Sequence, residues 1–276
     1  MIGNIEKMIV ALSGQNDGAV QYQLPVGDET LNMNDAIGKT INLQYQSEIH
    51  CIACARKTKK SFGQGFCYPC FRDLARCDMC IMKPETCHFD QGTCREPDWA
   101  EKNCMQPHYV YLANSSGIKV GITRGTQIPT RWIDQGASEA LPIFEVQARK
   151  QSGLLEVALK QHISDRTDWR KMLKGSPDSV DLVAVRDELL EKCKTEIAEI
   201  QSEFGAAAIK AINDENVVKI QYPVSQYPEK VKSLNFDKQA EIEGKLLGIK
   251  GQYLILDIGV LNIRKFSGYL LNVSVS

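Results

Sequence analysis

Hydrophobic and polar residues alternate in two segments near the N-terminus and again along residues 216–276. The N-terminal segments are 19–26 and 37–48, and both carry β-branched or aromatic residues. A period of two is typical of strands that bury one face. Because glycines separate the C-terminal runs, we expect a small, strongly bent sheet or barrel there, which the N-terminal strands could complete.

The middle of the chain predicts a β-hairpin followed by a helix and a third strand. Residues 108–114 and 118–123 are short β-type runs separated by Ser-Ser-Gly, which suits a tight turn. A helix is expected to begin near Pro129, because proline suits a first helical turn, and to stop at Gly136. Residues 141–149 then predict a strand.

A helix is expected directly after this strand, with Ser152 as its cap. Leu155, Ala158, Leu159 and His162 recur at helical spacing, so they would share one apolar face. This interpretation makes His162 a core-facing residue.

Two more helices are expected before the C-terminal strands. The first is short and lies around Trp169, and the second is long and amphipathic, from after Pro177 to about Ile209. Cys193 falls in the apolar stripe of the long helix. We therefore interpret Cys193 as a small buried core residue, which is the usual environment of a free cysteine.

Composition adds one anomaly, a chain with ten cysteines. All but Cys193 lie between Cys51 and Cys104. No apolar run approaches the length of a membrane span, and the N-terminus lacks the features of a signal peptide. We therefore expect a cytoplasmic protein without a membrane partner, in which a cysteine cluster indicates metal ligation in preference to disulfides.

The strongest chemical signal is the spacing Cys51-x2-Cys54-x12-Cys67-x2-Cys70. Each CxxC pair places two thiolates on one tight turn, and the spacer lets the two turns face each other around a tetrahedral ion. The sequence therefore predicts a structural Zn²⁺ site. Four thiolates leave no open position on the ion, so this site should perform no chemistry.

A third CxxC pair begins a second set of donors that is larger than one tetrahedral ion needs. We expect a second zinc held by Cys77, Cys80 and two of three further cysteines, with either of two histidines as a substitute. The candidates are Cys87, Cys94 and Cys104, and His88 and His108. An iron–sulfur cluster is the alternative, because several thiolates at mixed spacing would also suit it.

Residues 108–173 resemble the GIY-YIG nuclease fold in a variant form. Tyr109-Val-Tyr111 and Lys119-Val-Gly-Ile-Thr123 stand where that family has its two half-motifs, and an arginine and a glutamate follow on the next two predicted helices. Tyr109 replaces the motif's glycine, and Lys119 replaces its second tyrosine.

The GIY-YIG resemblance implies a set of candidate catalytic residues, namely Tyr111, Lys119, Arg131 and Glu156. By this resemblance Tyr111 would orient the attacking water, Arg131 would bind the scissile phosphate, and Glu156 would hold Mg²⁺ or Mn²⁺. His108 or His162 could carry a proton. The implied activity is divalent-metal-dependent hydrolysis of phosphodiesters in DNA or RNA.

The chain as a whole resembles an uncharacterised bacterial domain-of-unknown-function family. The similar stretches are residues 47–51, 77–88, 92–99, 110–124, 128–137 and 248–269. This resemblance implies no activity, so the function must be argued from the site.

The competing interpretation is a zinc-containing module that binds DNA or RNA without cutting it. Its contacts would be the basic residues of one cysteine loop together with basic and aromatic residues of the central segment: Arg56, Lys57, Lys59, Lys60, Arg124, Arg131 and Trp132. The formal net charge of -1 does not argue against this, because residues 119–174 carry an excess of Lys and Arg while 181–215 are acidic.

Together these patterns predict an α+β protein built from five consecutive parts. The parts are an N-terminal β element, a cysteine-rich zinc module, a GIY-YIG-like α/β domain, an amphipathic helix and a C-terminal β domain. Their expected boundaries are 1–49, 50–107, 108–175, 176–215 and 216–276.

Overall fold

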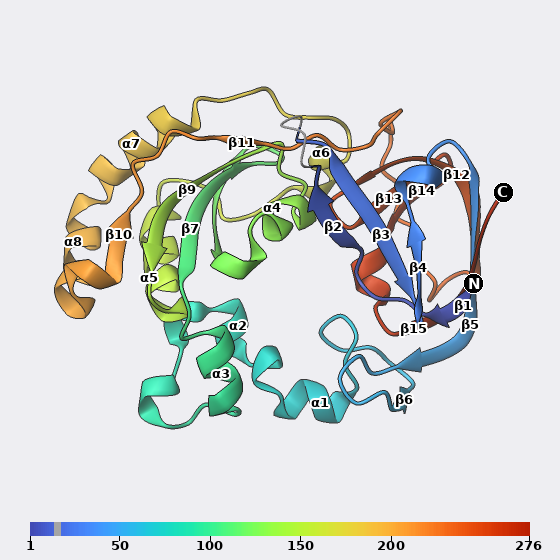
Figure 1. Ribbon diagram of the computed structural model, residues 1–276, viewed down its shortest axis with the longest axis horizontal. Coiled ribbons are helices and arrows are strands. Elements are labelled where there is room, and N and C mark those ends of the chain that lie inside the picture. The colour runs from blue at the N-terminus through green and yellow to red at the C-terminus, as the bar shows by residue number, and fades with distance from the viewer. Residues whose placement is uncertain (14–17) are drawn as a thin grey trace.

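The computed structural model describes residues 1–13 and 18–276, in which short helices combine with three antiparallel sheets (Figure 1). The expected α+β class is confirmed. The largest sheet has the order β1 (Ile2–Asn4), β15 (Tyr269–Val275), β5 (Thr40–His50), β12 (Glu241–Lys250), β13 (Tyr253–Leu256) and β14 (Gly259–Asn262), and β6 (Lys57–Thr58) pairs with β5. Because β5 lies between β15 and β12, N-terminal and C-terminal strands form one sheet.

The other two sheets are smaller. One has the order β2 (Ile9–Leu12), β3 (Val20–Val26) and β4 (Glu29–Asn32). The central sheet has the order β10 (Ile209–Ala211), β9 (Glu139–Val146), β7 (His108–Asn114) and β8 (Ile118–Arg124), and β11 (Val218–Lys219) also pairs with β9. The predicted hairpin is confirmed, because β7 and β8 pair from His108–Arg124 to Asn114–Ile118.

The helices are short. Those of the cysteine-rich segment are α1 (Tyr68–Asp73), α2 (Met79–Met82) and α3 (Pro97–Asn103). Those of the remaining chain are α4 (Thr130–Asp134), α5 (Arg149–Leu159), α6 (Trp169–Met172), α7 (Leu182–Lys192) and α8 (Lys194–Phe204). The helices expected near Pro129 and Trp169 are thereby confirmed.

The ends of α5 differ from the expectation. The helix begins at Arg149, because the side chain of Gln151 accepts a hydrogen bond from the backbone N–H of Ala148, and Ser152 lies inside the first turns instead of capping them. The helix ends at Leu159, so His162 lies beyond it and is exposed. The prediction of a core-facing His162 is therefore wrong.

The single long helix expected up to Ile209 is wrong, because two helices, α7 and α8, meet at Cys193. Cys193 is fully buried, as expected, and its thiol donates to the carbonyl of Ala158 at 3.8 Å. The break lets the two halves cover different elements, since α7 packs on β7 and β9 whereas α8 packs on α5. Ile209 itself begins β10.

The two faces of the central sheet belong to different apolar cores. On β7, Val110 and Leu112 pack with α5, α7 and α8, while Tyr111 and Ala113 point to the opposite face. There they share a core with Trp132 of α4 and with the largest sheet. Because side chains alternate between the two faces of β7, the central sheet packs against α5, α7 and α8 on one face and against the largest sheet on the other.

The cysteine-rich segment connects the two larger sheets along a second route. In Figure 1 these sheets lie on opposite sides of the molecule, and α1, α2 and α3 run along the lower edge between them. Close approach of this segment to α5 requires Gly153, because a Cβ at that position would lie 2.6 Å from the backbone nitrogen of Glu85.

We expect Gly153→Ala to lower the free energy of unfolding by up to about 2 kcal/mol. Alanine would favour the helix by about 1 kcal/mol, but overpacking against an immovable backbone costs about 1–3 kcal/mol. Thermal and urea unfolding measure the difference. Gly175→Ala is the control, because a Cβ at Gly175 meets nothing within 4 Å. Equal stability of the two variants would contradict the proposed contact.

Candidate functional site

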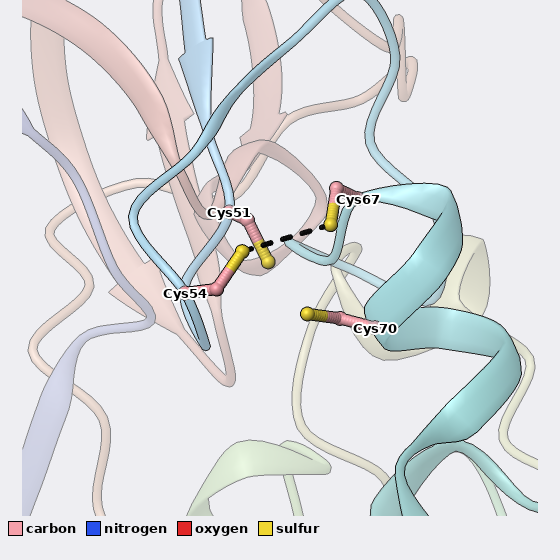
Figure 2. A group of neighbouring side chains, drawn as sticks. All are labelled: Cys51, Cys54, Cys67 and Cys70. Carbon is pink, nitrogen blue, oxygen red and sulfur yellow. Dashed lines mark hydrogen bonds between the residues drawn. The ribbon is translucent and has the colours of Figure 1, made fainter.

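The four cysteines of the first predicted zinc site lie together in the structure. Cys51 directly follows β5, Cys54 lies on the adjacent tight turn, and Cys67 and Cys70 lie at the start of α1 (Figure 2). One Sγ atom from each lies within 4.8 Å of the others, and the Cys54 and Cys67 Sγ atoms are 3.8 Å apart. Zn–S bonds of about 2.3 Å in a tetrahedron require thiolates about 3.8 Å apart. These residues therefore fit a zinc ion with no open position.

Backbone N–H groups lower the pKa of one thiol of this cluster, which favours metal binding. Burial opposes ionisation of Cys51, but backbone hydrogen bonds from Cys67, Ala53 and Cys54 outweigh it and lower the pKa of Cys51 to about 6. Burial and the hydrogen bonds of the other thiols raise the pKa of Cys70. The backbone therefore favours the thiolate form of Cys51, which is the form that binds a metal ion.

A second group of donors lies further along the segment. Asp78, Cys80 and His88 each offer an atom within 4.8 Å of the other two, so this group could also bind zinc. Asp78 has other partners, because it forms a 2.6 Å ion pair with Arg95 and accepts from the backbone N–H of Cys80. Burial and then Asp78 raise the pKa of Cys80 to about 11, and so do Cys87, Cys104 and Cys94.

Cys77 does not join this second group. It packs with Cys51, Phe66 and Cys67 in the small apolar cluster around the first site. Cys77 ends a 3-10 turn, whereas Cys80 lies inside α2. The ligand set that combines Cys77 with Cys80 stays a prediction.

A cavity of about 540 Å³ lies between the cysteine-rich segment, the central sheet and the largest sheet. Its cationic lining residues are Lys7, Arg76, Lys119, Arg124, Arg131, Arg149 and Arg264. Its acidic lining residues are Asp134, Glu156 and Asp165, and Lys7 already pairs with Asp134 at 2.9 Å. The cavity therefore has an excess of positive charge and would attract an anion.

Three of the four candidate catalytic residues line this cavity. Lys119 comes from β8, Arg131 from α4 and Glu156 from α5. Burial, and after it the charge of Arg131, lowers the pKa of Lys119 to about 8. Burial, and after it the charge of Asp165, raises the pKa of Glu156. Two carboxyl groups therefore lie close together beside the buried lysine.

Tyr111, the fourth candidate, lies behind the cavity wall. It is fully buried, and its hydroxyl donates to Gln135 at 3.1 Å. A Cβ at residue 121 would lie 2.7 Å from this hydroxyl oxygen, so only glycine fits at position 121. Burial raises the pKa of Tyr111, although the nearby Arg131 opposes the change.

The candidate nucleic-acid contacts are scattered. Arg124 lines the cavity, but Arg56, Lys57, Lys59 and Lys60 are exposed residues outside it. Lys57 pairs with Glu48 at 2.7 Å.

Trp132 is only 2% exposed and packs edge-to-face on Tyr111. Its ring is therefore unavailable to stack on a base, and that prediction is corrected.

The four cationic residues of the cavity that carry no sequence signal are Lys7, Arg76, Arg149 and Arg264. They come from the link between β1 and β2, the cysteine-rich segment, the start of α5 and the 3-10 helix between β14 and β15. No local motif links them, since only the tertiary fold brings them together.

Comparisons with known proteins add one finding. The family described as "Protein of unknown function (DUF2797)" matches residues 38–271. Neither the curated proteins nor the solved structures give a match. Among the described residues, no helix is long and apolar enough to cross a bilayer.

We expect Cys67→Ser to remove one zinc ion per chain and to lower the midpoint of thermal unfolding. A structural zinc contributes directly to folding, and a serine hydroxyl does not replace a thiolate ligand. Elemental analysis of the purified variant gives the metal content. Cys193→Ala, far from the cluster, should keep the full zinc content, and an unchanged zinc content in Cys67→Ser would refute the site.

Proposed function

We propose that this chain, which belongs to the DUF2797 family, acts on the phosphodiester backbone of nucleic acid at its basic cavity. The observation that supports this function is the meeting of Lys119, Arg131 and Glu156 in one cavity dominated by cationic side chains. Those residues come from three elements, and they are three of the four that the GIY-YIG resemblance selects.

Each residue type suits one part of phosphodiester hydrolysis. Arg131 and Lys119 would bind the scissile phosphate and neutralise the charge that develops on it. Glu156, with Asp165 beside it, would hold Mg²⁺ or Mn²⁺, since hard cations prefer carboxylate oxygens. The ion, when bound, would polarise the phosphate and lower the pKa of a water. Gln135, which accepts from Tyr111, would connect the phenol to the cavity.

The zinc site would act as a structural support for this cavity. Arg76 belongs to the same cysteine-rich segment as the zinc ligands, and it reaches the cavity wall. A closed four-thiolate ion would fix the position of this segment without taking part in the reaction.

The second candidate function is binding of nucleic acid without cleavage. It is favoured by the complete burial of Tyr111, which does not itself line the cavity. In this function the cationic residues would hold the backbone and no water would be activated.

We expect Glu156→Gln to lower the rate of cleavage of labelled DNA or RNA by about a hundredfold or more with Mg²⁺ or Mn²⁺. The substitution keeps the shape but removes the charge that would hold the metal. Affinity for the uncleaved strand should stay within about threefold, because Arg131 and Lys119 remain. Glu199→Gln, an exposed position on α8, is the matched control.

Cleavage at the wild-type rate by Glu156→Gln would refute the catalytic assignment. Binding by the wild-type protein without any cleavage would select the second candidate function.

We expect the affinity for a single strand to decline as the pH rises through about 8. Burial lowers the pKa of Lys119 to about 8, so the side chain is cationic below this pH and neutral above it. Arginine stays charged throughout, so Lys119→Arg should lose the decline. Fluorescence anisotropy between pH 6 and pH 9.5 measures the profile, and the exposed Lys230→Arg is the control. An identical profile in Lys119→Arg would contradict the role of Lys119.

A further inference from the structure

Two arginines of the cavity have buried donors that nothing in the described part of the chain satisfies. They are Arg124, at the end of β8, and Arg149, at the start of α5, and the Nε atom of each is buried without a hydrogen-bond partner. An unsatisfied buried donor is costly, and a native site that keeps one commonly awaits a ligand.

Both guanidinium groups are held firmly from the side of the cysteine-rich segment. Arg124 donates from Nη1 to the side-chain oxygen of Asn103 in α3, and Arg149 donates from Nη2 to the carbonyl of Ile81 in α2 at 2.8 Å. These acceptors are neutral. They fix the orientation of each group but leave its charge uncompensated.

Neither charge is paired directly with a carboxylate among the described residues, although the charge of Glu156 acts on Arg149. Neither Arg124 nor Arg149 has an acidic oxygen within 4.0 Å in the part of the chain that the structure describes. Asp134, which also lines the cavity, forms an ion pair with Lys7 and accepts a hydrogen bond from Gln252. Arg124 and Arg149 are half-buried, but their Nε atoms are fully buried and unpaired, so an anion from outside that accepts from these atoms would remove the cost.

The two arginines share one cavity with the residues assigned above. Arg124, Arg149, Arg131 and Lys119 all line this cavity of about 540 Å³. Arg124 and Lys119 come from the same strand, β8, and Arg149 begins α5, the helix that carries Glu156. A ligand in the cavity can therefore meet Arg124 and Arg149 as well as Arg131.

We propose that Arg124 and Arg149 form a second phosphate subsite beside the one assigned to Lys119 and Arg131. The ligand class is a molecule with two adjacent phosphate groups, either a single strand of nucleic acid or a free diphosphate. This inference rests on the proposed function, which it deepens by giving the cavity a neighbouring phosphate to hold. Arginine suits the role, because its planar donors match phosphate oxygens in pairs.

A competing role for Arg149 is to neutralise thiolates. Its charge acts on Cys104 and Cys80, and its backbone N–H donates to the carbonyl of Cys104 at 2.8 Å. If that were its function, replacing Arg149 would change the metal content of the protein and leave phosphate binding intact. The two roles therefore have different readouts.

The test compares Arg124→Gln and Arg149→Gln with the wild-type protein in buffer without added divalent metal. Affinities for inorganic pyrophosphate and for a labelled single-stranded oligonucleotide are measured by calorimetry and by anisotropy. Arg72→Gln is the matched control, since Arg72 is an exposed arginine whose side chain pairs with its neighbour Asp73. Zinc content and circular dichroism are recorded for every variant.

We expect Arg124→Gln and Arg149→Gln each to bind pyrophosphate, the oligonucleotide or both about tenfold to a hundredfold more weakly than the wild type. This is the usual effect of losing a charge-assisted contact. The slope of the logarithm of the oligonucleotide binding constant against the logarithm of the salt concentration should also become shallower by about 0.7 per lost phosphate contact. Arg72→Gln should bind like the wild type. Weakening with pyrophosphate alone identifies a free diphosphate as the ligand, and weakening with the oligonucleotide alone identifies a strand.

Unchanged affinity for both probes in folded Arg124→Gln and Arg149→Gln overturns the subsite. Unchanged affinity with reduced zinc content overturns it in favour of thiolate neutralisation. If Arg149→Gln does not fold, Arg124→Gln decides. Lost probe binding in a protein that never cleaves nucleic acid would support the subsite while refuting the nuclease function, so the two failures are distinguishable.

Discussion

Repulsion between like charges is the constraint on which this architecture depends. The cavity has seven cationic and three acidic lining residues, so repulsion between its cations is only partly offset, and packing elsewhere must hold these groups in place. Three connections do so: the strand pairing of β5 with β15 and β12, the apolar core shared by Tyr111 and the largest sheet, and the cysteine-rich segment. Each joins parts of the chain that are distant in sequence.

The cysteine-rich segment has little apolar material with which to provide such a connection. Its core is a small cluster around Cys51, Phe66 and Cys67, far smaller than the cores on the two faces of the central sheet. A segment of this kind is held by metal ligation where packing is insufficient. Because Cys51 directly follows β5, a metal at the first site would fix the segment to the largest sheet. The hydrogen bonds from Arg124 and Arg149 then fix its other end to the central sheet.

The sequence predicts those features that depend on neighbouring residues. The β7–β8 hairpin, the short helix at Trp169 and the spacing of Cys51, Cys54, Cys67 and Cys70 are all local, and each was predicted. One tertiary feature, the joining of N-terminal strands to the C-terminal sheet, was also predicted. The break at Cys193 was not, because it follows from α7 and α8 covering different elements.

Only part of the candidate site could be predicted from the sequence. A resemblance could select Lys119, Arg131 and Glu156, because their order along the chain carries the signal, but Lys7 and Arg264 have no motif around them. The net charge of the chain also gives no sign of the site, because the acidic helices α7 and α8 offset the cavity's positive charge in the total. These helices contribute no residue to the cavity lining, so they do not neutralise the cavity itself. Charge balance over the whole chain is compatible with strong local imbalance, because at physiological salt the interaction between exposed charges fades beyond about 8 Å. The local imbalance, fixed by the fold, decides which ligand the cavity can hold.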